Sequence, residues 1–185
     1  MTEKMKKGLQ EILSSDEKIL WESGTQAFAL FSGKEGRMVL LRWVICAVGA
    51  AALAAAYATH GASRSGAFYI VLLLALAVII GAPILTHRQL LAQRYYVTDR
   101  RAFILRPDGS IRAMERAAVD DCRLYSLDCG GVALAVGGEL APEGDKQLRW
   151  RAAHPIEASD YAVHGMVFYR PERADDALRI LRGEG

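Results

Sequence analysis

Arg100 and Arg101 are the residues whose type and position best suit the binding of a charged ligand, and they directly follow Thr98 and Asp99. Guanidinium groups form paired hydrogen bonds with phosphate oxygens, so the doublet predicts a contact with lipid headgroups or with a partner protein. The same four residues are also typical of a tight turn, in which Thr98 and Asp99 cap backbone amides and the arginines pair with nearby carboxylates. Both interpretations stay open at this point, and the turn is the simpler of the two.

The other reactive side chains lack the spacing that catalysis requires. No serine or cysteine lies in a GxSxG context, and the CxxC, P-loop, dinucleotide-binding and HExxH motifs do not occur. The acidic doublets 120–121 and 175–176 direct their carboxylates to different sides of a strand or helix. The histidines and cysteines are scattered: His60, His87, His154, His164, Cys46, Cys122 and Cys129. The sequence therefore predicts a non-enzymatic protein without catalytic residues, metal or cofactor.

The distribution of charge argues against nucleic-acid binding. Residues 1–37 carry six basic and six acidic groups and residues 87–185 carry fifteen of each, so the net charge of +2 comes from Arg42 and Arg64 alone. A nucleic-acid surface needs clustered charge of one sign, which this balance does not provide. The same two arginines are the only charges between Met38 and Thr86, and such a long apolar stretch indicates membrane-spanning segments.

Two hydrophobic helices are predicted, at 38–58 and 66–86. Each has about 20 residues, enough to cross a hydrocarbon core of about 30 Å at about 1.5 Å per residue. The short connection between them allows only an antiparallel hairpin. Arg42 lies one turn inside the first predicted helix, where its side chain can extend to the headgroups. We therefore expect Arg42 to be an interface anchor rather than a buried functional charge.

Basic residues around the hairpin predict a two-span inner-membrane protein with both termini in the cytoplasm. Lys34, Arg37 and Arg42 precede the hairpin and Arg88, Arg94, Arg100 and Arg101 follow it, whereas the connecting loop contains only Arg64. The aromatic residues agree, because Trp43 would lie at the inner interface while Tyr57 and Tyr69 would lie at the outer one. The first dozen residues are polar, so no cleaved signal peptide is expected.

Rows of alanine in the first helix predict close helix packing. One row contains Ala47, Ala51 and Ala55, and the other contains Ala50, Ala54 and Ala58. Small residues at this spacing let a neighbouring backbone approach closely. Packing within the hairpin is the simplest explanation, and a second copy of the chain or a larger membrane complex is the alternative. The expected partners are therefore the lipid bilayer and a membrane protein or second copy.

The segment 1–37, before the hairpin, is expected to be cytoplasmic or interfacial. Residues 5–13 place Met5 and Leu9 on the apolar face of a short amphipathic helix, which could rest on the membrane or on the following domain. Residues 18–23 form a short apolar run around Trp21, and the run at 26–31 is interpreted as interfacial.

The chain after the hairpin, residues 87–185, is predicted to be a cytoplasmic domain of seven short strands and one helix. Turn signals separate runs rich in β-branched and aromatic residues. The predicted strands are 94–98, 101–106, 110–115, 119–127, 132–136, 147–152 and 163–169. A helix is expected to follow Pro171 and Glu172, with an apolar stripe formed by Ala174, Ala177, Leu178 and Leu181. The predicted fold class is thus α+β, a helical hairpin at 38–86 followed by a β-barrel or sandwich capped by a C-terminal helix.

Two segments resemble a known family. The run YYVTDRRAFILRPDGSIR, Tyr95 to Arg112, is similar to the signature of bacterial pleckstrin-homology-like (PH-like) domains that follow transmembrane helix pairs. The upstream DEKILWESG, Asp16 to Gly24, resembles the tryptophan-containing lead before such hairpins. The chain is also distantly similar to assembly proteins of bacterial photosynthetic membrane complexes, although it has one hairpin where that group has a third helix. The resemblance implies a PH-like fold at the membrane, and little about chemistry.

These observations predict a membrane-anchored PH-like binding module. Its domain would contact a protein partner or the inner membrane surface, in the assembly or regulation of a membrane complex. The alternative is a membrane-embedded enzyme or transporter accessory subunit whose chemistry lies at the hairpin, around Arg42. A buried Arg42 in contact with polar groups of the helices would favour this alternative.

Overall fold

The computed structural model describes Met5, Leu9 and residues 13–14, 16–60, 65–137, 144–157 and 162–184; for His60, Ile156 and Glu157 it describes the backbone alone. The described residues form two compact units. The first unit, called the soluble unit below, contains the residues up to Phe28 together with those from Arg88 onward, and the second contains residues 29–87. The segment 1–37 thus contributes to both units.

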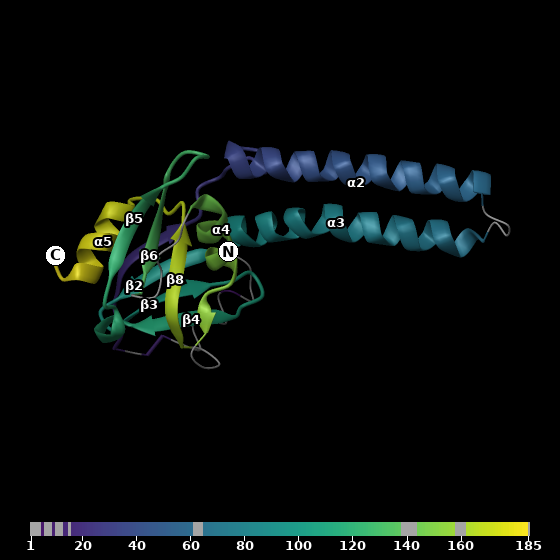
Figure 1. The fold of residues 1–185 in the computed structure, drawn as a ribbon. Helices are drawn as coiled ribbons and strands as arrows, with labels where there is room; N and C mark the ends of the chain where they lie inside the picture. Colours follow the sequence, from purple (N-terminus) through teal and green to yellow (C-terminus); the bar gives the residue numbers. More distant parts are fainter. Residues whose placement is uncertain are drawn as a thin grey trace. The chain divides into compact units, whose positions relative to one another are not determined.

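Two long apolar helices make up most of the second unit. α2 spans Gly33–His60 and α3 spans Gly66–Ala92, and Figure 1 shows them as an antiparallel pair. Both are long and apolar enough to cross a bilayer, and scarcely any side chain in their most apolar stretches is buried. The two predicted helices are confirmed, and both are longer than expected. Of the alanine rows, the one containing Ala50 is buried or half-buried and the one containing Ala51 is exposed.

Four antiparallel strands form the first sheet, in the order β1-β2-β3-β4. Their bounds are Ile19–Gly24 (β1), Arg94–Thr98 (β2), Arg101–Leu105 (β3) and Ile111–Glu115 (β4). β1 precedes the helical hairpin and β2 follows it, yet Trp21 pairs with Val97 and Gly24 with Arg94. The hairpin is therefore an insertion between two neighbouring strands of one sheet. Sequence patterns alone do not identify β1, because its partner strand lies beyond both helices.

The second sheet has the strand order β5-β6-β8-β7. Its strands are Cys122–Ser126 (β5), Val132–Val136 (β6), Val163–Tyr169 (β8) and the two-residue Ile156–Glu157 (β7), and a short 3₁₀ helix at Arg116–Ala118 precedes β5. The strands predicted at 94–98, 101–106, 110–115, 119–127, 132–136 and 163–169 are confirmed, with the fourth shorter than expected. The least regular predicted segment, 137–146, lies mostly outside the described residues.

The prediction of a strand at 147–152 is wrong, because these residues belong to helix α4, Asp145–Ala153. Leu148, Trp150 and Ala152 alternate with polar residues, which imitates the period of a strand. In the helix Leu148 and Ala152 are one turn apart and both buried, while Trp150 is exposed. Packing of Leu148 and Ala152 against the second sheet thus decides between the two patterns.

Apolar side chains lie on both faces of each sheet. The facing sides enclose the main core, where the rings of Trp21 and Phe168 stack at 5.9 Å between centroids. The other face of the first sheet packs Tyr96 and its neighbours against Met5 and Leu9, so these two residues of the N-terminal segment rest on the domain. The other face of the second sheet packs against α4. Strands buried on both faces explain why simple alternation is weak in β2, β3 and β6.

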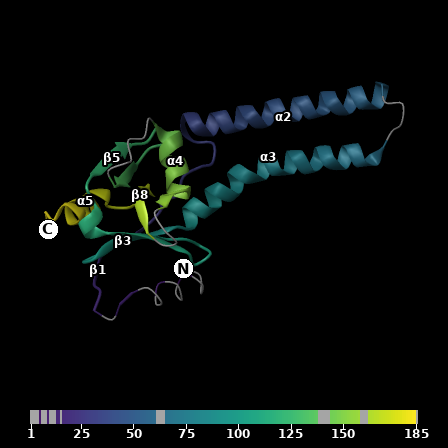
Figure 2. The same ribbon diagram turned by 60° about the horizontal axis from the view of Figure 1, so that its bottom comes forward.

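Helix α5, Ala174–Arg182, closes the space between the sheets. It contacts strands of both sheets and lies beside β5 (Figure 2). Ala174, Ala177 and Leu181 are buried, whereas Leu178 of the predicted stripe is half-buried against the core. The α+β class, the two apolar helices and the C-terminal helix are thus confirmed. The β-structure is two antiparallel sheets and not a closed barrel, and a parallel bridge joins Ala113 to Ala162.

The Tyr95 hydroxyl holds together the segments at which the hairpin is inserted. It lies 2.7 Å from the hydroxyl of Thr25, just after β1, and 3.3 Å from the amide oxygen of Gln93, just before β2. It also accepts a hydrogen bond from the backbone N–H of Tyr169, at 3.1 Å. Burial of this phenol raises its pKa to about 12, so the hydroxyl stays protonated at physiological pH.

Candidate functional site

Thr98 organises the turn that carries Arg100 and Arg101. Its fully buried hydroxyl accepts the backbone N–H groups of Arg100, at 3.3 Å, and of Arg101, at 3.0 Å, and donates to Glu17 at 2.7 Å. Asp99 exchanges two hydrogen bonds with Lys18, one through its carboxylate and one through its backbone N–H, each 3.1 Å long. Residues 17–18 therefore fix this turn from a segment that precedes the hairpin.

Arg101 forms a two-point ion pair with Glu17. Its Nε lies 2.8 Å from Glu17 Oε1, and its Nη2 lies 2.5 Å from Oε2. The Glu17 side chain is 1% exposed and the Arg101 side chain 26% exposed. The Arg101 guanidinium holds the pKa of Glu17 below its usual value, and the carboxylate raises the pKa of Arg101. Arg101 is thus already paired with a carboxylate, as the turn interpretation expects.

A hollow of about 780 Å³ lies beside this ion pair, and we call it the arginine hollow. Four arginines and three acidic residues line it, together with a few others: Arg100, Arg101, Arg116, Arg182, Glu17, Asp99 and Glu115. Arg116 donates to the carbonyl of Ile180 and Arg182 to the carbonyl of Cys122, at 3.1 Å for the second bond. Within the described part of the chain, Arg100 is the hollow's exposed arginine without an ion pair or side-chain hydrogen bond.

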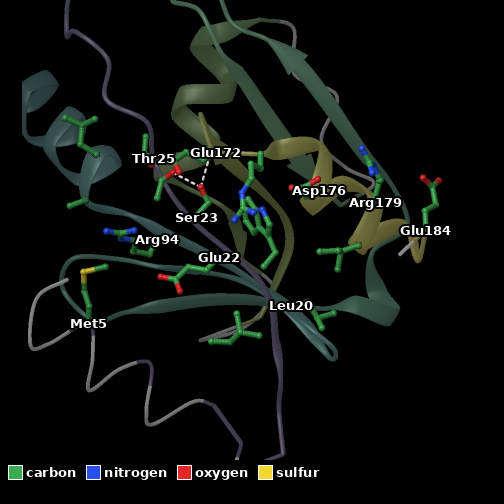
Figure 3. Close-up of a pocket in the computed structure, with 17 residues that line it drawn as sticks. Met5, Leu20, Glu22, Ser23, Thr25, Arg94, Glu172, Asp176, Arg179 and Glu184 are labelled. Atoms are coloured by element: carbon green, nitrogen blue, oxygen red, sulfur yellow. Dashed lines mark hydrogen bonds between the residues drawn. The ribbon is translucent and has the colours of Figure 1, made fainter.

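A larger groove of about 1,030 Å³ runs along β1 and α5, and we call it the β1–α5 groove (Figure 3). Its walls are the whole of β1, the end of α3 and the exposed side of α5. Ile19 and Leu20 are 42% and 46% exposed. Four acidic and three basic side chains also line the groove: Glu22, Glu172, Asp176, Glu184, Arg94, Arg173 and Arg179. The groove thus combines apolar side chains with charges of both signs.

β1 is an edge strand, and only part of its outer edge is covered. The Ser23 hydroxyl accepts the backbone N–H of Glu172 at 2.8 Å, and the N–H of Gln26 donates to the carbonyl of Arg170 at 2.8 Å. Figure 3 shows Ser23 and Glu172 close together at this end of the groove. No other strand among the described residues pairs with the outer edge of β1 from Ile19 to Glu22. Such an edge can accept an added strand.

The predicted membrane anchors lie on α2 and α3, and Arg100 and Arg101 lie in the soluble unit. Arg42 is exposed on α2, and Trp43 packs edge-on against Phe31 at 5.4 Å between ring centroids. Tyr57 contacts Tyr69 edge-on at 5.7 Å, near the turn of the hairpin. The aromatic residues therefore gather at two levels of the hairpin, and their position at membrane interfaces stays a prediction.

The sequence does not indicate the roles of Glu17 and Ser23. Both lie within the DEKILWESG segment, whose resemblance to a family lead is the one available signal. Their partners lie after the hairpin, so no local pattern could connect them.

The described residues contain no group of three or more histidine, cysteine, aspartate or glutamate side chains placed to hold a metal ion. Burial raises the pKa of the Cys122 thiol to about 11, which disfavours the nucleophilic thiolate. Comparison of the chain with family models, curated proteins and solved structures finds no match. The site is therefore described by its own geometry.

Proposed function

We propose that this chain is a two-span inner-membrane protein whose PH-like domain is a non-enzymatic binding module for a membrane complex. The insertion of the hairpin between β1 and β2 carries the proposal. Because Gly24 and Arg94 are paired, the chain leaves and re-enters one sheet at neighbouring positions. If α2 and α3 span the bilayer, both ends of the hairpin must then lie on the same side as the domain. Two packed antiparallel sheets and a C-terminal helix support the PH-like assignment.

The excess of basic residues flanking the hairpin favours the cytoplasmic side for the domain. Reporters placed before Met1 and after Gly185 should both give a cytoplasmic signal, and a reporter at Ser63 should give an external one. Adding arginines by Gly61→Arg with Ala62→Arg should weaken this orientation, because the bias is counted over short loops. A cytoplasmic signal at Ser63 would contradict the spanning hairpin.

The β1–α5 groove is the proposed binding site, and its occupant is an extended segment of a partner protein. The open edge of β1 can supply backbone hydrogen bonds, while the exposed Ile19 and Leu20 offer apolar contacts. Tethering by two helices raises the local concentration of the domain at the membrane, so modest affinity suffices. Arg42 is exposed and makes no hydrogen bond or ion pair in the described region, so no observation favours chemistry at the hairpin.

The groove can be tested in native membranes with the full chain. A photo-cross-linking residue at Leu20 or Arg179 should yield one adduct of discrete mass with a membrane-complex protein. The same residue at Arg123, exposed on β5 outside the groove, should yield at least several-fold less. Ile19→Lys should reduce the adduct formed from Arg179, because it places a charge among the apolar contacts. Equal adducts at Arg123, or none in the groove, would contradict the assignment.

A further inference from the structure

Helix α4 presents an unusual outer surface. Trp150 is 53% exposed, although tryptophan is normally largely buried. The guanidinium of Arg151 lies 4.9 Å from the centre of its ring, and the ring of His154 stacks on it at 5.1 Å. Lys146 is exposed and Arg149 is half-buried. In the described part of the chain Lys146, Arg149 and Arg151 form no ion pair, so no carboxylate there neutralises their charges. The Arg149 guanidinium lies 5.4 Å from the centre of the Phe28 ring.

The inner face of α4 ties it to the two places where the chain enters and leaves the hairpin. Leu148 and Ala152 pack in one cluster with Leu90, which is fully buried, and with Phe28. The amide of Gln93, directly after α3, donates to the carbonyl of Ala152 at 3.1 Å. α4 is thus fixed within the soluble unit at the last turn of α3.

This attachment limits how far α4 can lie from the bilayer, if α3 spans it as proposed. Leu90 follows Thr86, the end of the apolar stretch, by four residues, or about 6 Å of helix at about 1.5 Å per residue. Basic side chains within a Debye length of about 10 Å of an anionic membrane are attracted to it. Tryptophan favours the same interfacial layer, where its ring is partly buried and its N–H stays hydrated.

Arg100 and Arg101, the residues predicted to contact lipid, are less suited to headgroup binding than the basic residues of α4. β2 begins at Arg94, next to the end of α3, and runs for five residues before the turn. At about 3.3 Å per residue this places the turn about 16 Å along the strand from the end of α3. Arg101 is also occupied by Glu17. The charges of α4 are therefore the better candidates for headgroup contact.

We infer that α4 docks on anionic lipid headgroups of the leaflet facing the domain, through Trp150 and the basic residues Lys146, Arg149 and Arg151. The inference rests on the proposed function only in requiring that α3 enters the bilayer. Charge complementarity selects the occupant: three unpaired basic residues and one exposed indole on one short helix suit an anionic interface. Docking there would hold the domain in one orientation relative to the membrane.

The test uses the full chain reconstituted into phosphatidylcholine vesicles, with and without phosphatidylglycerol, that contain a headgroup-attached fluorescence quencher. The Trp150 signal is the difference between the wild type and Trp150→Phe. It should be quenched more strongly in the anionic vesicles at low salt. Salt at about 1 M, where the Debye length is about 3 Å, should remove the difference.

Lys146→Gln with Arg151→Gln should lower the ratio of docked to undocked protein by about 25-fold, or about fivefold for each charge. Arg100→Gln with Arg123→Gln removes the same charge from exposed positions elsewhere and should leave the quenching unchanged. Equal effects of the two pairs, equal quenching in both kinds of vesicle, or an unquenched Trp150 would each overturn the inference. If one of these results is found while the Ser63 reporter gives an external signal, only the α4 contact is contradicted. If the Ser63 reporter gives a cytoplasmic signal, the proposed function itself is contradicted.

Discussion

Trp21→Ala should lower the free energy of unfolding of the soluble unit by about 3–5 kcal/mol, the usual cost of removing a large buried aromatic side chain. Trp21 is 4% exposed, stacks on Phe168 and lies on β1, before the hairpin. The loss should therefore appear in a domain most of whose residues follow the hairpin. It can be measured by pulse proteolysis of the full chain in detergent across a urea series.

Leu20→Ala is the matched control, because Leu20 precedes Trp21 on the same strand and is 46% exposed. Its effect should stay within about 0.5 kcal/mol. Deletion of residues 1–28 should have a still larger effect than Trp21→Ala, since it removes β1, turns β2 into an edge strand and opens the core. Equal stability losses for Leu20→Ala and Trp21→Ala would mean that β1 does not belong to the sheet.

Glu17→Gln should destabilise the soluble unit by about 2–3 kcal/mol and should flatten its response to acid. The substitution weakens the hydrogen bonds to Arg101 and Thr98 and leaves the Arg101 charge without its partner. Arg101 lowers the folded-state pKa of Glu17, so the ionised carboxylate stabilises the fold. This stabilisation is fully present when the pH is above the unfolded-state pKa of Glu17, about 4.5. This contribution is lost as the pH falls through the lower folded-state pKa.

The measurement compares the unfolding free energy of the wild type and of Glu17→Gln as the pH is lowered from neutrality. The two curves should converge in the acid range. Asp121→Asn is the control, because the Asp121–Arg123 pair is exposed and should contribute less than about 1 kcal/mol. A gap between the wild type and Glu17→Gln that stays constant below the pKa of Glu17 would contradict the ion-pair account.

Local sequence signals were sufficient wherever an element depends on its own residues. The hairpin of β2 and β3 follows from YYVT and RAFIL on either side of a turn, and both predicted strands match the observed ones within one residue. The wrong prediction of a strand at 147–152 also comes from local signals. Leu148, Trp150 and Ala152 have the period of a strand, while Leu148 and Ala152 also fit one face of a helix. The contacts of Leu148 and Ala152, not their spacing, select the helix.

The candidate site was only partly accessible from sequence. The sequence predicts Arg100 and Arg101 together with the turn that holds them. It does not predict that Glu17 is the partner of Arg101, because Glu17 precedes both helices in the chain. The β1–α5 groove was not predicted either. Its walls come from β1 and α5, which lie near opposite ends of the chain.

The two long apolar helices, the β-rich character of the following domain and its C-terminal helix follow from the sequence, because each depends on composition and period within one segment. Three features come from the folded chain instead: β1 pairs with β2 across the hairpin, Glu17 neutralises Arg101, and α4 packs beside the end of α3. These features are contacts between segments that the two helices or several strands separate. Backbone hydrogen bonding and burial of apolar side chains select such partners in space, and the order of residues along the chain does not record them.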